Sequence, residues 1–233
     1  MADTVNLQTA SLFSKLRYYA GEQGLLHAIA AGLGRKSFGF WRTVGPLFTA
    51  QAFQNYKARH RSGPTLLNLG GGSNRLPAAF SVDVDARSDA YVDVTKPLPF
   101  PDRSFSSIFC EEVIEHVNRE QGARLLQECS RILEPGGLIR LTTPDLMYFC
   151  SEALANDRNG QEINKIFYGH GHQHIYSNAS LEAALSQAGF RDIRFGTYKD
   201  KNSRLGQYDS HADRFNHPPE ISLYVEAIAG RAN

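Results

Sequence analysis

Hydrophobic residues gather in short runs after the first quarter of the chain, and most runs are followed by glycine, proline or acidic residues. Such runs are typical of strands buried on both faces, as in a parallel sheet. We expect strands at 65–69, 80–84, 90–94, 106–110, 138–142, 190–198 and 221–229. Between the later runs the hydrophobic positions have helical spacing, which predicts helices over 118–133, 149–166 and 178–189. Strands that alternate with helices indicate an open α/β sheet.

The segment from about Thr9 to Arg61 also has hydrophobic positions at helical spacing, broken by glycines and by Pro46. This predicts two or three helices. The connections between the first three strands are too short for crossover helices, which generally need a dozen or more residues. One sheet face is then partly uncovered, and we expect the N-terminal helices, with the aromatic residues at 38–48, to cover it. A substrate lid is the alternative for these aromatic residues.

The stretch TLLNLGGGSN, residues 65–74, leads the first strand straight into three glycines. Such a turn lets a ligand contact the backbone, and ligands of open α/β sheets lie beyond the carboxyl ends of the strands. A dinucleotide would favour G-x-G-x-x-G, but Arg75 takes the third glycine position and Pro77 lies where the helix should run. The chain has no G-x-x-x-x-G-K-[ST] motif either. A nucleoside ligand without a pyrophosphate fits this loop, and a plain strand-to-loop turn is the simpler alternative.

Acidic residues follow the next two strands. Asp83 and Asp85 come after the second strand, and Asp93 lies at the end of the third. An acidic side chain placed shortly after the glycine loop can accept both hydroxyl protons of a ribose. Each carboxylate could instead cap a turn.

Four further motifs occur between Leu66 and Asp145 in the order of a known family. They read LNLGGGSN, LPFPDRSF, EEVIEHV and ILEPGG. The stretch IYSNASLEAALSQAGF, residues 175–190, is similar to a late helix and strand of the same family. On these motifs the chain resembles the class I S-adenosylmethionine-dependent methyltransferases, in particular the type 11 group. It looks closest to small members associated with cell-surface glycan synthesis.

The resemblance implies a fold and a division of the chain. The implied fold is α/β and Rossmann-like: a seven-stranded, mostly parallel sheet with an antiparallel last strand and an N-terminal helical extension. We expect the extension in residues 1–61 and the methyltransferase domain in residues 62–233.

The resemblance also implies the cofactor, S-adenosyl-L-methionine, and its contacts. Gly70 and Gly72 would approach the methionine part, and Asn68 would hold the loop. Asp83 would accept hydrogen bonds from the ribose, with Asp85 as the second candidate, and Asp93 would accept from the adenine amine. The full expected cofactor-binding set is Asn68, Gly70, Gly71, Gly72, Asp83, Asp85, Asp93 and Glu111.

The acceptor side offers fewer clues. Methyl transfer from a sulfonium is an in-line displacement that needs no metal, so we expect none. An oxygen or nitrogen nucleophile can need a base, and histidine suits that role near neutral pH. The catalytic candidates at the carboxyl ends of the strands are His174, beside Tyr176, together with His116 and Asp145.

Three alternating histidines complicate this interpretation. On an extended segment His170, His172 and His174 would share one face, which suggests a metal site. No acidic or cysteine partner accompanies them locally. We therefore favour a single histidine, His174, in substrate binding or proton removal.

Composition limits the class of protein. Hydrophobic residues make up 42% of the 233 residues, and no apolar run approaches the roughly 18 that a membrane-spanning helix needs. The first residues lack the pattern of a signal peptide, so the sequence predicts a cytoplasmic protein. Three widely spaced cysteines fit neither a disulfide framework nor zinc spacing.

The net charge of +1 hides an asymmetry, since the first 61 residues contain eight basic residues and only two acidic ones. A basic segment suits an anionic substrate, a phospholipid surface or nucleic acid, and a solvated helix face is the alternative.

Two classes of function remain open. The first is a methyltransferase acting at oxygen or nitrogen of a small-molecule or glycan acceptor. The second is a non-catalytic protein that binds S-adenosylmethionine or a partner. A nucleic-acid methyltransferase is disfavoured, because the chain has no D/N-P-P-Y/F motif and its N-terminal basic residues are scattered among apolar ones. We expect no nucleic-acid partner, whereas peripheral membrane contact is compatible with the basic N-terminal segment. The sequence does not indicate whether the protein is a monomer or an oligomer.

Overall fold

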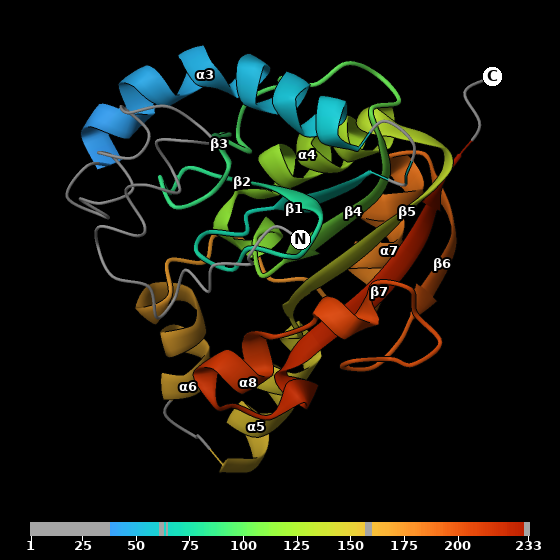
Figure 1. The fold of residues 1–233 in the computed structure, drawn as a ribbon. Coiled ribbons are helices and arrows are strands. Elements are labelled where there is room, and N and C mark those ends of the chain that lie inside the picture. Colours follow the sequence, from blue (N-terminus) through green and yellow to red (C-terminus); the bar gives the residue numbers. More distant parts are fainter. Residues whose placement is uncertain (1–37, 61–62, 64, 157–159, 231–233) are drawn as a thin grey trace.

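The computed structural model describes residues 38–60, 63, 65–156 and 160–230. Its seven strands form one sheet in the order β3-β2-β1-β4-β5-β7-β6 (Figure 1). Neighbouring strands from β3 to β5 are parallel, and β7 is antiparallel to both β5 and β6. The strands are β1 (Leu66–Leu69), β2 (Ala79–Asp83), β3 (Ala90–Tyr91), β4 (Phe105–Glu111), β5 (Leu133–Pro144), β6 (Phe190–Phe195) and β7 (Ser222–Ala229). The predicted sheet and its antiparallel last strand are confirmed.

Two of the helices begin with reciprocal side-chain caps. Asn118 accepts a hydrogen bond from the backbone N–H of Gln121, whose side chain accepts one from Asn118 in return. Ser177 and Ser180 form the same reciprocal arrangement. Each pair satisfies two backbone donors that the first helical turn leaves free. The helices are α3 (Phe38–Arg59), α4 (Arg119–Ile132), α5 (Leu146–Asn156), α6 (Gln161–Asn164), α7 (Asn178–Gln187) and α8 (His211–Phe215).

Helix α3 covers the face of the sheet that the short connections leave open (Figure 1). Phe53 and Tyr56 belong to the main hydrophobic core, and the ring of Phe53 lies 5.4 Å from that of Phe105. The hydroxyl of Tyr56 also accepts a hydrogen bond of 3.0 Å from the backbone N–H of Leu66. The expected covering role is therefore confirmed for α3, and the helices expected before residue 38 lie outside the described residues.

Pro46 lies inside α3, so the prediction that it breaks the helix is wrong. Next to it, Gly45 packs so closely on β3 that an added Cβ would lie 2.5 Å from Cβ of Tyr91. The Thr49 hydroxyl donates a 2.7 Å hydrogen bond to the Tyr91 carbonyl, and Trp41 packs edge-on against the same ring. These contacts stabilise α3 at Pro46, which removes one backbone hydrogen bond from the helix. They also confirm the packing interpretation for Trp41.

The polar composition of the segment from Lys199 to Glu220, with Gly206, Pro218 and Pro219, predicts a long loop, and this prediction is wrong. It contains a 3₁₀ helix at Gly206–Tyr208, the short helix α8, and a second 3₁₀ helix that begins at Pro219. The fully buried guanidinium of Arg140, on β5, donates two hydrogen bonds to the carboxylate of Asp209, at 2.8 and 2.5 Å. A contact across 69 residues fixes the segment, and local composition does not reveal it.

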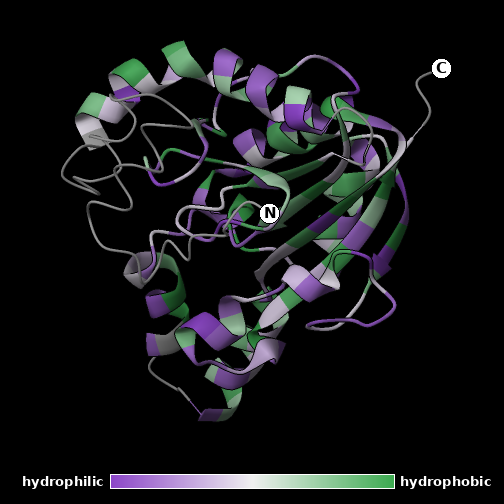
Figure 2. Ribbon diagram, in the orientation of Figure 1, coloured by the Kyte–Doolittle hydropathy of each residue, from purple (hydrophilic) through white to green (hydrophobic). Residues whose placement is uncertain are grey.

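Hydrophobic colour is concentrated on the central strands in Figure 2, whereas α8 is largely hydrophilic. None of the helices that the structure describes is both long and apolar enough to cross a bilayer. The cytoplasmic location stays a prediction.

Candidate functional site

The glycine loop lies at the carboxyl end of β1, and protein contacts shape its first two glycines. An added Cβ at Gly70 would lie 2.2 Å from Cγ2 of Val113, and one at Gly71 would lie 2.3 Å from Nδ2 of Asn68. The buried side chain of Asn68 donates a 2.7 Å hydrogen bond to the carbonyl of Asn74 and so closes the loop. Gly70 and Gly71 are therefore required by close packing inside the protein.

Gly72 differs, because its Cα faces open space. Among the described residues, the only heavy atom within 4 Å of an added Cβ would be Oδ2 of Asp83, at 3.8 Å. The backbone N–H of Gly72 donates a 2.9 Å hydrogen bond to that oxygen, and the N–H of Asp85 donates one of 2.9 Å to Oδ1. Burial is the main cause that raises the pKa of Asp83. A carboxylate offers about four lone-pair sites, so Asp83 keeps acceptor capacity for a ligand in the open space.

Asp85 directs its carboxylate toward its own loop. The guanidinium of Arg87 donates to both oxygens, with Nε 2.9 Å from Oδ1 and Nη2 2.5 Å from Oδ2. A bidentate pair of this kind holds both groups in one geometry. Of the two carboxylates that follow β2, Asp83 is thus the one beside the glycine loop.

Asp93 follows β3 and lies one strand further along the same edge of the sheet. The N–H of Val92 donates a 3.1 Å hydrogen bond to the carbonyl of Asp83, which places the two acidic residues on neighbouring strand ends. Oδ1 of Asp93 accepts hydrogen bonds from the backbone N–H and the hydroxyl of Thr95, at 3.0 and 2.7 Å. One oxygen of Asp93 therefore caps a turn, as the alternative interpretation expected.

Glu111 ends β4, and its carboxylate anchors the start of α8. It accepts hydrogen bonds from the backbone N–H and hydroxyl of Ser210, at 2.6 and 2.8 Å, and from the guanidinium of Arg214, at 2.7 Å. Burial alone would raise its pKa, but the hydrogen bonds from His211 and Ser210, with the charge of Arg214, lower the pKa to about 2. The structure thus brings Glu111 to the expected edge of the sheet and surrounds it with donors from α8.

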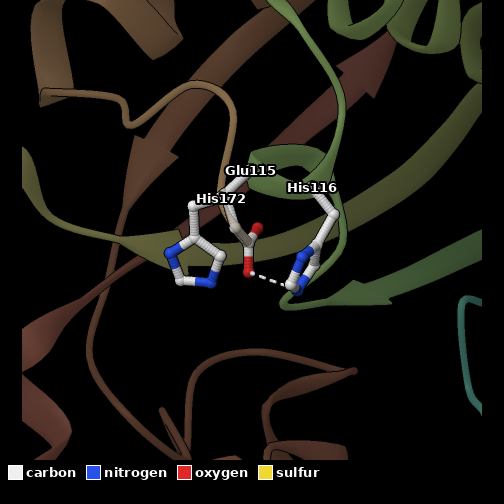
Figure 3. A group of neighbouring side chains, drawn as sticks. All are labelled: Glu115, His116 and His172. Atoms are coloured by element: carbon white, nitrogen blue, oxygen red, sulfur yellow. Dashed lines mark ion pairs between the residues drawn. The ribbon is translucent and has the colours of Figure 1, made fainter. Parts of the chain in front are cut away.

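The turn after β4 carries a second group of polar side chains (Figure 3). Glu115 and His116 lie on the 3₁₀ helix Ile114–His116, and His172 comes from the segment that follows α6 and its π-helical turn Lys165–Gly169. The ring centroids of His116 and His172 are 4.7 Å apart. Burial lowers the pKa of His116, and burial followed by the charges of His116 and His170 lowers the pKa of His172 to about 4. Both imidazoles are therefore neutral near pH 7.

The other two catalytic candidates lie beside this group. His174 packs edge-on against Tyr176, with ring centroids 4.5 Å apart, and burial is the main cause that lowers its pKa. Asp145 caps α5, because its Oδ1 accepts a 2.9 Å hydrogen bond from the N–H of Met147. Residues 145 and 176 form a β-bridge, so both segments reach the same edge of the sheet. His170 and His172 stack on each other, whereas His174 contacts Tyr176, so the three alternating histidines do not act as one cluster.

Sequence reasoning missed the contribution of α8, and of the buried residues that contact it, to this edge of the sheet. The buried ring of His211 lies against Glu111, with Nδ1 3.3 Å from Oε1, and its Nε2 is 3.1 Å from the hydroxyl of Ser222. Burial alone would lower the pKa of His211, but the hydrogen bond with Glu111 raises it. The pair EE at 111–112, next to an expected strand end, was the available signal in the sequence.

Comparisons with known proteins agree with this architecture. The model of a family described as "Methyltransferase domain" matches residues 46–194. A search of curated proteins finds no match.

Solved structures show the same fold. An S-adenosylmethionine-dependent methyltransferase from Archaeoglobus fulgidus is 16% identical with a TM-score of 0.50, over 82% of this chain and 99% of that one. One from Mesorhizobium loti is 18% identical with a TM-score of 0.51, over 75% and 96%. Phosphoethanolamine N-methyltransferase 2 of Haemonchus contortus, solved with S-adenosyl-L-methionine, is 14% identical with a TM-score of 0.50, over 93% and 60%.

The family model covers well over half of the chain, from within α3 to β6. The seven-stranded, mostly parallel sheet with its antiparallel last strand and the glycine loop after β1 are those that the resemblance implied. The chain therefore belongs to the family described as "Methyltransferase domain" and has the fold of the class I S-adenosylmethionine-dependent methyltransferases.

Proposed function

We propose that this enzyme methylates an oxygen or nitrogen atom of a small-molecule or glycan acceptor, which lies between the glycine loop and the histidines that follow β4. The observation that carries the proposal is the open space at Gly72 beside the carboxylate of Asp83. It lies at the carboxyl ends of β1 and β2, where an open α/β sheet holds its ligand.

The residues around that space fit the cofactor. Asp83 accepts from the ribose hydroxyls, since a carboxylate is the usual partner of a ribose at this strand end. Gly72 leaves room for the methionine part, and the free oxygen of Asp93 accepts from the adenine amine. Asn68, Gly70 and Gly71 keep the loop in shape from inside the protein. In this proposal Glu111 acts on the cofactor side only through α8, which it anchors.

The acceptor side rests on the polar side chains that reach the same edge. His116, Gln173 and His170 are exposed, and His174 is half-buried against Tyr176. Such groups offer donors and acceptors to a hydroxylated or amino acceptor. The acceptor atom attacks the methyl carbon as the bond from that carbon to sulfur breaks, and the electron pair stays on sulfur. His174, neutral because burial lowers its pKa, takes the proton that the acceptor loses.

A labelled-cofactor screen tests the proposal. The enzyme is incubated with methyl-labelled S-adenosylmethionine and separate fractions of sugars, nucleotide sugars, lipid-linked glycans, small amines and RNA. We expect label in a sugar-containing or small-amine fraction and none in RNA. Label only in RNA would overturn the acceptor class. Tight cofactor binding, shown by calorimetry, without label in any fraction would favour the non-catalytic alternative.

A further inference from the structure

Three metal-ligating side chains from two distant segments converge after β4. Glu115 and His116 follow β4 directly, and His172 lies more than fifty residues later in the chain. One ligand atom from each lies within 4.8 Å of the other two, and Nε2 of His116 is 3.9 Å from Oε1 of Glu115. Figure 3 shows the carboxylate of Glu115 between the two imidazoles, with a nitrogen of each ring turned toward it.

The carboxylate of Glu115 is the unusual member of this group. The residue is fully buried, with 0% of its surface exposed. Its Oε2 accepts a 3.1 Å hydrogen bond from the hydroxyl of Thr143, whereas Oε1 finds no hydrogen-bond partner among the described residues. A buried polar atom without a partner is costly, and native proteins rarely keep one without a reason. This oxygen, Oε1, is the one that faces the imidazoles.

The backbone holds the two segments in register. The N–H of Gln173 donates a 2.7 Å hydrogen bond to the carbonyl of Glu115, and its side-chain amide donates one of 2.7 Å to the carbonyl of His116. His172, the neighbour of Gln173, is thereby fixed opposite the turn after β4. This arrangement supplies the acidic partner that the alternating histidines lack in the sequence.

We propose that Glu115, His116 and His172 bind a divalent first-row transition metal ion. Two imidazole nitrogens and one carboxylate oxygen form a donor set that such ions accept, with positions left for water or a ligand. Metal–ligand bonds of about 2.1 Å bring tetrahedral ligand atoms to about 3.4 Å from one another. The side chain of His116 is 46% exposed, so it can rotate to close the remaining distance.

The location suggests what such an ion does, an interpretation that rests on the proposed function. Val113, two residues before Glu115, packs against Gly70, so the metal group borders the glycine loop. Methyl transfer needs no metal, but a bound ion with open positions can hold an oxygen of the acceptor near the cofactor. The acceptor would then carry an oxygen donor, as hydroxylated glycans do.

Metal binding is measured directly, apart from activity. Tag-free full-length protein is stripped with EDTA, exchanged into metal-free buffer and titrated with ZnCl₂ or CoCl₂ in a calorimeter. The visible absorption of bound Co²⁺ reports nitrogen and oxygen coordination. We expect one ion per chain. No binding of either ion would overturn the proposal.

Variants locate the ion. His116→Ala and His172→Ala should each weaken binding by about tenfold or more, because each removes one of three ligands. Glu115→Gln should do the same, and the exposed His116 provides the test if the buried variant does not fold. His60→Ala is the control, a histidine at the end of α3 that packs on Tyr56 and lies outside this group, and should bind as the wild type does. Unchanged binding in both His116→Ala and His172→Ala would place the ion elsewhere and overturn the proposal.

Activity then separates the two proposals. If EDTA-stripped enzyme binds S-adenosylmethionine normally and regains methyl transfer on addition of metal, the ion serves the acceptor. If metal binds at this site but transfer is the same without it, the interpretation of its role is wrong, whereas the site itself stands.

Discussion

The backbone N–H of Gly72 donates a 2.9 Å hydrogen bond to Oδ2 of Asp83, which joins the ends of the first two strands beside the open space of the candidate site. This contact fixes the direction of the carboxylate before any ligand arrives. A group held in its binding geometry loses little conformational entropy when the ligand binds. Asp83 is thus suited to act as a rigid acceptor.

Replacing Asp83 by asparagine should weaken S-adenosylmethionine binding by about tenfold to a hundredfold, because hydrogen bonds to a charged acceptor contribute about 1.5–3 kcal/mol. Calorimetry on the folded variant measures this loss. Asp85→Asn is the matched control, since Arg87 already occupies the Asp85 carboxylate, and its affinity should change less. The reverse order of the two variants would assign the ribose to Asp85.

Substitutions at Gly70 and at Gly72 should have different effects, the first on stability and the second on cofactor binding. Gly72→Val should leave the protein folded, because its Cβ enters open space, but should abolish cofactor binding. Gly70→Ala should lower the melting temperature without any cofactor present, because its Cβ meets Val113 at 2.2 Å. Both residues have positive φ, where valine strains the backbone more than alanine does, so Gly72→Ala is the matched comparison for Gly70→Ala, and the difference between these two variants reports the surroundings. Normal binding by Gly72→Val would remove the loop from the site.

Much of this site was accessible from sequence because its signals are local. The run LLNL before three glycines predicted β1, and the helical spacing of apolar residues over 118–133 predicted α4. Each depends on residues only a few positions apart, where backbone geometry and capping chemistry are decided.

The remainder depends on contacts between distant residues. The order of the segment 199–220 rests on Arg140 and Asp209, which are 69 residues apart, and the position of α8 rests on Glu111 and Arg214, 103 residues apart. Periodicity carries no information on which distant charges will pair. For the same reason the spacing of the alternating histidines could not predict that His172 lies beside Glu115.

The buried ion pair of Arg140 and Asp209 should contribute strongly to stability. Asp209→Asn should lower the free energy of unfolding by about 3–5 kcal/mol, because it removes the two charge-assisted hydrogen bonds of a buried guanidinium and leaves it, among the described residues, only Glu226, at 3.6 Å, as an acidic partner. Asp192→Asn is the control, since Asp192 pairs with Arg191 on the surface and such pairs contribute about 0–1 kcal/mol. Urea unfolding measures both. Equal, small effects would show that Arg140 finds other partners.

Glu111 should make stability depend on pH. Its pKa is lowered from the ordinary 4.5 to about 2 in the folded protein, so its contribution to stability is present above pH 4.5 and is lost as the pH falls toward 2. The difference between the two pKa values of Glu111 corresponds to a stabilisation of at most about 3 kcal/mol. His211 has a raised pKa, so its contribution is complete below pH 6.5 and is lost as the pH rises through that raised value.

The comparison of wild type with Glu111→Gln isolates this pair. The stability difference in urea unfolding should be largest between about pH 4.5 and 6.5, where both groups of the wild type are charged, and should shrink toward pH 3. A difference that does not vary with pH would assign the effect to packing alone.

His174 offers the test of the acceptor side. Its ring packs against Tyr176, and burial lowers its pKa, so at neutral pH it is free to accept a proton. His174→Ala should therefore lower kcat by about a hundredfold while cofactor affinity stays nearly the same, since a general base typically contributes 10²–10⁴-fold. Single-turnover transfer with labelled cofactor measures the first quantity and calorimetry the second. In the wild type the rate should fall as the pH drops below the lowered pKa of His174, because a protonated imidazole cannot take the proton, and this limb should vanish in the variant. If wild type and variant label the acceptor equally, His174 has no part in the transfer.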